Sequence, residues 1–231
     1  MPNIYIDPDE IRKAIRIMKP GGELFEVRII NGMKSISGYF RDPEVLINRL
    51  SAMDLKNANV YMTLQQLHEG CEARYQWECF VDAGKNKLPT TSDNDIVRYS
   101  FIPIDLDPIR PAGISSNEEE LKAANEMQEQ IAAYMAAQGF TRYIKACSGN
   151  GYHLLYTIDE PNNEETKEYV RGILTHLNDL FKNDQCKVDT GNFNPARILK
   201  LYGTLAQKGR HTEKRPHRMS KILEVKGFET S

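Results

Sequence analysis

The chain has 231 residues, of which 40% are apolar and 27% charged, an ordinary composition for a globular protein of one domain or two fused modules. A formal net charge of −2 excludes a generally basic nucleic-acid coat. No stretch approaches the roughly 20 apolar residues of a membrane span, and charges interrupt the N-terminal 20 residues too often for a signal peptide, so we expect a cytoplasmic protein with no membrane partner.

Residues 1–95 predict an N-terminal α/β module. Capping residues mark the starts of helices, and short apolar runs mark strands. The expected elements are a helix from Asp7 or Asp9 to Met18, strands over residues 24–30 and 60–64, and a helix from Asp42-Pro43 to Leu50. Residues 83–95 are rich in Gly, Pro, Thr, Ser and Asn and predict a loop, so we place the module boundary after residue 95.

Residues 96–225 predict a second module with the order βαββαβ. The expected elements are a strand over 98–105, a helix that Ser115 or Ser116 caps and that ends near Gly139, strands over 142–147 and 152–158, a helix over 166–181, and a last strand in 185–189 or 196–202. This arrangement brings the end of its first strand beside the start of its third. Asp105 and Asp107 should therefore lie near His153, and Asp189 reaches the same end if 196–202 is the last strand.

The motif FIPIDLDP places two carboxylates on one face of a strand. Side chains at i and i+2 point to the same side, so Asp105 and Asp107 lie together, and Ile104 and Leu106 point the other way. Adjacent carboxylates repel one another unless a cation lies between them. Paired Mg²⁺ or Mn²⁺ ions do this in polymerases. The plainer alternative is an Asp pair that ends a strand before Pro108.

The segment SGNGYH predicts a turn that binds anions. Gly149 and Gly151 free the backbone to direct N–H groups at a ligand. Ser148 and Asn150 add short polar side chains, and His153 can donate to a phosphate oxygen. A hairpin turn with a hydrogen-bonded histidine explains the same residues.

Basic residues gather near the C-terminus. From Arg197 to Lys221 there are eight lysines and arginines and one acid, Glu213. Asp189 precedes this tract as a candidate third metal ligand. Phosphate contact is the functional interpretation of the tract, and a solvated surface is the alternative.

Together these motifs resemble the archaeo-eukaryotic primase superfamily, above all the primase-polymerase domains of phages, plasmids and CRISPR-associated proteins. The resemblance spans about residues 38 to 218 and rests on Asp105-Leu-Asp107, on the segment 148–153, and on Asp189 followed by NPARILKLYGT. It implies an α+β fold in which the N-terminal α/β module packs on an RRM-like (βαββαβ) catalytic module.

The resemblance implies a DNA primase-polymerase that extends primers and starts chains de novo from nucleoside triphosphates on a single-stranded template. It implies a two-metal site of Mg²⁺ or Mn²⁺, and a fused or associated helicase or CRISPR adaptation proteins as further partners. The implied metal-binding and catalytic residues are Asp105, Asp107 and Asp189. The candidate nucleotide-binding residues are Ser148, Asn150, Gly151, His153, Arg197, Lys200 and Lys208. The candidate nucleic-acid-binding residues are Arg210, Lys214, Arg215 and Arg218.

Two other functions fit parts of the sequence. One is a non-catalytic RRM-like nucleic-acid-binding module, which needs exposed aromatic side chains on its central strands. The predicted strands offer only Tyr99, Tyr143 and Tyr152. The other is a metal-dependent nuclease that uses the same carboxylates, and no arrangement of a tyrosine or lysine nucleophile favours it over polymerisation.

Overall fold

Two antiparallel β-sheets form the framework of the molecule, which the computed structural model describes over residues 4–228. The first sheet has the order β10-β3-β1-β2-β5. Its strands are β1 (Phe25–Asn31), β2 (Lys34–Phe40), β3 (Asn59–Thr63), β5 (Val81–Asp82) and β10 (Ile198–Lys200). The last of these comes from the far end of the chain, so the C-terminal part of the sequence completes the first sheet.

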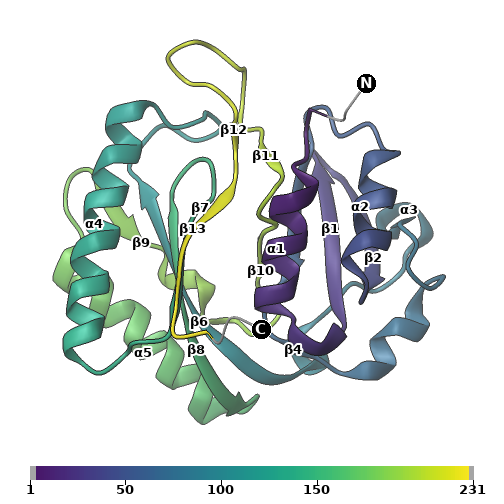
Figure 1. The fold of residues 1–231 in the computed structure, drawn as a ribbon, viewed down its shortest axis with the longest axis horizontal. Helices are drawn as coiled ribbons and strands as arrows, with labels where there is room; N and C mark the ends of the chain where they lie inside the picture. The colour runs from purple at the N-terminus through teal and green to yellow at the C-terminus, as the bar shows by residue number, and fades with distance from the viewer. Residues whose placement is uncertain (1–3, 229–231) are drawn as a thin grey trace.

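The second sheet has the order β13-β7-β8-β6-β4, and β9 also pairs with β6. Its strands are β4 (Gln66–Leu67), β6 (Ile96–Pro108), β7 (Tyr143–Cys147), β8 (Tyr152–Pro161), β9 (Cys186–Val188) and β13 (Lys221–Lys226). A two-stranded ribbon, β11 (Leu205–Ala206) and β12 (Arg218–Met219), lies between the two sheets (Figure 1).

The helices begin where the sequence supplies caps. The α-helices are α1 (Pro8–Met18), α2 (Pro43–Ser51), α3 (Ala83–Asn86), α4 (Glu118–Ala137) and α5 (Glu164–Phe181), and the 3₁₀ turns are η1 (Pro20–Gly22), η2 (Glu69–Arg74), η3 (Asp93–Asp95) and η4 (Thr190–Phe193). Asp7 caps α1 and Asp42 caps α2, as the sequence predicts. Helix α4 differs: its N-cap is Asn117, which forms a capping box with Glu120. Residues 83–95, expected to be a loop, contain α3 and η3.

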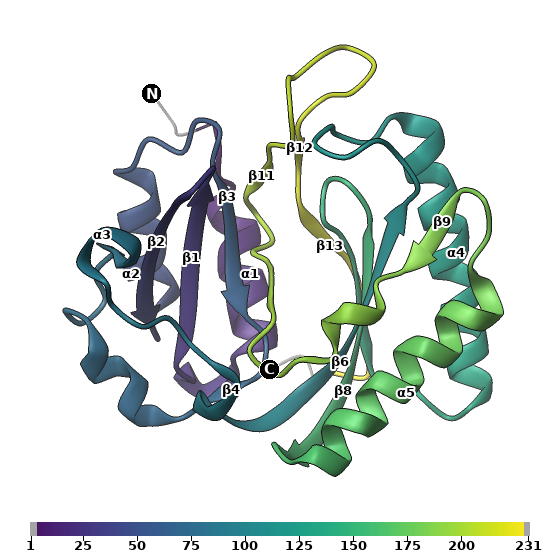
Figure 2. The same ribbon diagram turned by 180° about the vertical axis from the view of Figure 1, so that it is seen from behind.

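Helices α4 and α5 cover the outer face of the second sheet (Figures 1 and 2). Alternate side chains of β6, including Ile102, Ile104 and Leu106, are buried in the core beneath these helices. Phe101 points the other way, into a core shared with the first sheet and α1. Because side chains alternate along a strand, Asp105 and Asp107 lie on this inner face, between the two sheets.

The βαββαβ module is present, and one of the two alternatives for its last strand is correct. The strand order β9-β6-β8-β7 places the first strand between the third and the fourth, and every neighbouring pair is antiparallel. Residues 186–188 form the last strand, beside β6. Residues 198–200 instead pair with β3, because the turn η4 carries the chain across to the first sheet. Among the described residues no helix is long and apolar enough to cross a membrane.

Candidate active site

Three strands bring the sequence motifs together at one end of the second sheet. Asp105 on β6 lies opposite His153 on β8, and the imidazole Nε2 is 3.4 Å from the Asp105 carboxylate. Asp189 directly follows β9, and its backbone N–H donates to the carbonyl of Asp105 (2.8 Å). The predicted proximity is confirmed, but Asp189 reaches the site at the end of 186–188 rather than before 196–202.

These residues line a cavity of about 550 Å³ between the two sheets. One wall comes from the second sheet and the turn after β7, and the other from β3, β10 and β11. The charged and polar residues that line it are Asn59, Tyr61, Asp105, Asp107, Arg110, Ser148, Asn150, His153, Asp189, Asn192, Arg197, Lys200 and Lys208. The cavity therefore combines three carboxylates with four lysine or arginine side chains.

His153 is buried and held from behind by Tyr202. The imidazole Nδ1 is 2.8 Å from the Tyr202 hydroxyl. Burial, with Asp105 and Cys147 nearby, raises the pKa of Tyr202 well above its usual value, so the phenol keeps its proton. Because Nε2 faces a carboxylate, we assign its proton there, and the Tyr202 hydroxyl then donates to Nδ1. This arrangement aims an N–H donor at the carboxylate edge of the cavity.

The pKa values of the two carboxyl groups on β6 are shifted in opposite directions. Burial would raise the pKa of Asp105, but its interactions with His153, Asn192 and Arg197 outweigh burial and lower it. Burial and repulsion from Asp105 raise the pKa of Asp107, although Arg110 and Lys208 oppose this. Neighbouring carboxyl groups whose pKa values are shifted in opposite directions are typical of a functional site.

A buried asparagine that the sequence does not single out connects two of the predicted residues. The Asn192 side-chain amide donates to Asp105 (3.3 Å), and its oxygen accepts from Nε of Arg197 (2.8 Å). The Arg197 guanidinium also lies 3.6 Å from Asp189. Asn192 lies in η4, where only the surrounding motif DTGNFNPAR hinted at a role.

Lys200 is a buried cation on the wall opposite the carboxylates. The residue is only 5% exposed. Its ammonium donates to the carbonyl of Leu205 (3.0 Å) and lies 5.7 Å from the centre of the Tyr61 ring. Burial lowers the pKa of Lys200 to about 7. A phosphate group in the cavity would supply the negative charge that favours its protonated form.

The turn after β7 is fixed by its own backbone and by the loop before α4. The Ser148 hydroxyl donates to the carbonyl of Gly151 (3.2 Å), and the side-chain oxygen of Asn150 accepts from the backbone N–H of Ser116 (3.0 Å). A Cβ atom on Gly151 would lie 2.4 Å from the carbonyl oxygen of Leu106. Gly151 therefore lets the turn approach β6, while Ser148 and Asn150 both hold the turn and line the cavity.

The basic tract divides into two groups. Arg215, near the end of the loop over 207–217, pairs with Glu120 (2.7 Å), and Arg218, the first residue of β12, pairs with Glu118 (2.6 Å), so both fasten this part of the chain to the start of α4. Lys208, Arg210 and Lys214 are exposed, and Lys208 lines the cavity. The loop itself projects beyond both sheets (Figures 1 and 2).

The donor types at the site fit a divalent cation. Carboxylate oxygens are the ligands that Mg²⁺ and Mn²⁺ prefer, and Asp105, Asp107 and Asp189 all line the one cavity. In residues 4–228, however, no three Asp, Glu, His or Cys side chains lie close enough together to hold a metal ion as they stand. The three carboxylates therefore match a divalent cation in the type of donor atom and in their shared cavity, but not in their present spacing.

The fold is similar to that of a known primase. A crystal structure of the primase RepB′ aligns with a TM-score of 0.52 and 15% sequence identity over 96% of this chain and 57% of that chain. A crystal structure of the catalytic domain of primase RepB′ in complex with initiator DNA aligns with a TM-score of 0.49 and 15% identity, over 96% of this chain and 86% of that chain. No family model and no curated protein matches the sequence. The expected α+β fold is thus confirmed, and the chain spans little more than half of the first RepB′ structure.

Proposed function

We propose that the chain is a primase-polymerase: a metal-dependent nucleotidyltransferase that joins nucleotides on a single-stranded DNA template. The observation that carries this proposal is the meeting of Asp105, Asp107 and Asp189 with a buried histidine and a buried lysine in one cavity. The likeness in fold to RepB′ agrees with it. Extension of a primer and the start of chains without one both belong to the proposal.

Each part of the cavity has a role in this reaction. Asp105, Asp107 and Asp189 would hold Mg²⁺ or Mn²⁺. When bound, such ions lower the pKa of a hydroxyl and offset phosphate charge. Lys200, Arg197 and Lys208 supply positive charge for the triphosphate of the incoming nucleotide, and His153 supplies a fixed N–H donor. Arg210 and Lys214, on the exposed loop, would contact the DNA backbone.

The proposed reaction is an in-line displacement at phosphorus. A 3′-hydroxyl oxygen forms a bond to the α-phosphorus of the incoming nucleotide, and the bond from that phosphorus to the bridging oxygen breaks. Pyrophosphate leaves with the bonding electron pair, and the hydroxyl proton passes to solvent. Charge grows on the phosphate oxygens during this step, where the lysine and arginine side chains stabilise it.

The side chains on the central strands favour the enzyme over an RRM-like binding module. Such modules stack bases on aromatic side chains of their central strands. Tyr99 and Tyr143 are buried in the core beneath α4 and α5. The inner face of the sheet presents Asp105 and His153 instead, and carboxylates repel nucleic acid.

The proposal is tested by following nucleotide incorporation with Mg²⁺ or Mn²⁺, with and without a primer, on a homopolymer template. We expect the double variant Asp105→Asn with Asp107→Asn to lose more than about a hundredfold in rate, because the ligand charge is removed without a change of shape.

Asp179→Asn is the matched control, since Asp179 is an exposed acid on α5 outside the cavity. Full activity in the double variant would contradict the proposal. Metal-dependent cleavage of DNA that ignores nucleoside triphosphates would support a nuclease instead.

A further inference from the structure

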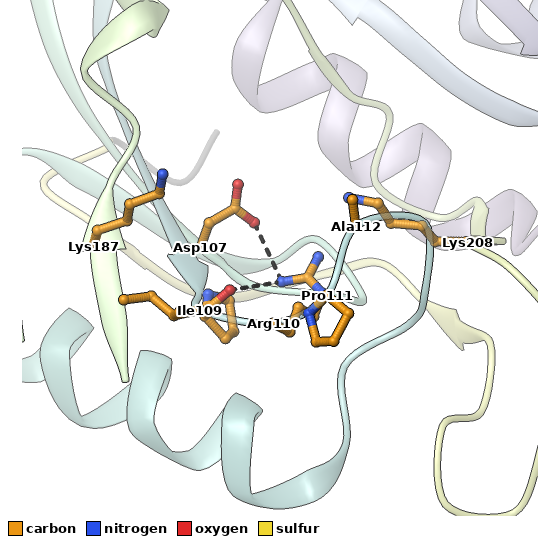
Figure 3. Close-up of a pocket in the computed structure, with 8 residues that line it drawn as sticks. Asp107, Ile109, Arg110, Pro111, Ala112, Lys187 and Lys208 are labelled. Atoms are coloured by element: carbon orange, nitrogen blue, oxygen red, sulfur yellow. Dashed lines mark hydrogen bonds and ion pairs between the residues drawn. The ribbon is translucent and has the colours of Figure 1, made fainter. Parts of the chain in front are cut away.

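A second, smaller cavity of about 310 Å³ lies beside Asp107 (Figure 3). Its walls are the loop that follows β6, the exposed lysine of β9, and the start of the basic tract. The lining residues are Asp107, Pro108, Ile109, Arg110, Pro111, Ala112, Lys187 and Lys208. Asp107, Arg110 and Lys208 also line the larger cavity, so the two cavities share one wall at Asp107.

Positive charge dominates the second cavity. It has three cationic side chains and one carboxylate. In Figure 3 the side chains of Lys187 and Lys208 extend on either side of Asp107. Arg110 lies 3.7 Å from Asp107, whereas neither lysine forms an ion pair within the part of the chain that the structure describes. A concave surface with an excess of positive charge attracts an anion.

The wall of this cavity is rigidly built, which distinguishes it from a chance group of surface lysines. The Arg110 side chain is 5% exposed, and it donates to the carbonyls of Pro108 (3.1 Å) and Ile114 (3.2 Å). The Ser115 hydroxyl donates to the carbonyl of Lys208 (2.9 Å). Gly209 has a positive φ of 68°, and a Cβ atom there would lie 2.3 Å from the carbonyl oxygen of Gly113. The loop after β6 and the basic tract are thus locked together.

We propose that this cavity binds a phosphate group of the nucleotide whose 3′-hydroxyl attacks, with Lys187 as its main contact. The inference rests on the proposed function. An in-line attack places the attacking oxygen and the leaving pyrophosphate on opposite sides of the α-phosphorus. If the incoming triphosphate lies against Lys200, the attacking nucleotide lies across the carboxylates, on the side of Lys187. Its phosphate is the 5′-triphosphate of a free nucleotide when a chain starts, and the last phosphodiester of the primer when a chain grows.

A binding experiment tests the cavity without any need for catalysis. The whole chain is titrated calorimetrically, with Mg²⁺, with a nucleoside triphosphate whose α–β bridge cannot be cleaved. We expect two binding events in the wild type and a loss of about tenfold in the affinity of one of them in Lys187→Ala, as for a lost charge-assisted hydrogen bond.

Lys122→Ala is the control, because Lys122 is a lysine on α4 with 77% exposure that lines neither cavity. We expect it to bind as the wild type does. A single binding event in the wild type, or two unchanged events in Lys187→Ala, would overturn the inference.

A kinetic experiment distinguishes the two sources of phosphate. The rate of dinucleotide formation is measured with a nucleoside, its 5′-monophosphate or its 5′-triphosphate as the attacking partner. The rate of primer extension is measured alongside. If the 5′-triphosphate reacts faster than the nucleoside in the wild type but not in Lys187→Ala, the bound phosphate belongs to a free nucleotide. If Lys187→Ala has a higher KM for the primer, the bound phosphate is the last phosphodiester of the primer. A change only in the KM of the incoming nucleotide counts against the inference. If the wild type binds two nucleotides but joins none, the proposed function fails and the second phosphate site stands.

Discussion

At the scale of single residues, the buried side chain of Lys200 lowers the stability of the fold near neutral pH and places a cation in the candidate site. Burial lowers the pKa of Lys200 to about 7, whereas the pKa of an unfolded lysine is about 10.4. Between these values the unfolded chain binds a proton that the folded chain does not. The free energy of unfolding therefore falls as the pH drops from about 10 to about 7, and this contribution is level at lower pH.

We expect Lys200→Met to be more stable than the wild type near neutral pH, by on the order of a few kcal/mol, because it removes the buried ionisable group. The advantage should shrink as the pH rises toward about 10.4, the pKa of an unfolded lysine, because above this value the wild-type lysine is neutral in both states. Urea denaturation at a series of pH values measures the difference. The exposed Lys122 offers a control, since Lys122→Met should show no such trend.

The same variant should bind triphosphate more weakly, because Lys200 lines the cavity. A Lys200→Met protein that is no more stable at pH 7 than at pH 10, relative to the wild type, would mean that the ammonium is not desolvated in the folded chain. In the expected outcome, Lys200→Met is more stable but binds triphosphate more weakly, a trade-off that is common where a functional group is held in an unfavourable environment.

At the scale of elements, the turn between β7 and β8 depends on glycine where it crosses β6. We expect Gly151→Ala to lower the free energy of unfolding by about 1 to 3 kcal/mol, as overpacking does, because its methyl group would meet the carbonyl oxygen of Leu106. The turn would move away from Asp107, so incorporation of nucleotides should fall as well. Urea denaturation and primer extension measure the two effects.

Gly172→Ala is the matched control for this change. Gly172 lies in α5, and a Cβ atom there meets nothing within 4 Å. Alanine favours helix over glycine by about 0.5 to 1 kcal/mol, so this variant should be slightly more stable and fully active. Equal stability of the wild type and Gly151→Ala would show that the turn does not pack against β6 as closely as described.

Elements that depend on the local sequence pattern, such as strand alternation and the order of strands and helices, could be predicted from the sequence. Alternation in FIPIDLDP placed Asp105 and Asp107 on one face, and the βαββαβ order brought them to His153. Partners that depend on long-range pairing could not be predicted. Nothing in the sequence near Ile198 says that it will pair with β3, and nothing near Arg215 says that its guanidinium will pair with Glu120.

Buried polar partners were also missed, for a related reason. Tyr202 reads as an ordinary core residue in LKLYGT, and its role appears only when β8 places His153 against its hydroxyl. Strand β13 was not expected, because charged residues interrupt its apolar positions. It forms the edge of the second sheet, where one side of a strand needs little apolar surface.

At the scale of the whole molecule, the candidate site lies between two sheets, and each sheet contains a strand from the other half of the sequence. Strand β10, from residues 198–200, forms one edge of the first sheet, and β4, from residues 66–67, forms one edge of the second. One core joins the two sheets through α1, so Ile11 and Ile15 share a cluster with Phe101 and Leu155. Separate unfolding of either sheet would expose this shared core.

We therefore expect the full chain to unfold in a single cooperative transition, with a calorimetric enthalpy equal to the van't Hoff enthalpy. Differential scanning calorimetry provides both values, and the loss of triphosphate binding should follow the same curve, since Lys200 and Asp105 come from opposite sheets. Two separate transitions would mean that the α1 interface is weak. The cavity would then open before either sheet melts, and the carboxylates would part from Lys200 at temperatures where the second sheet is still folded.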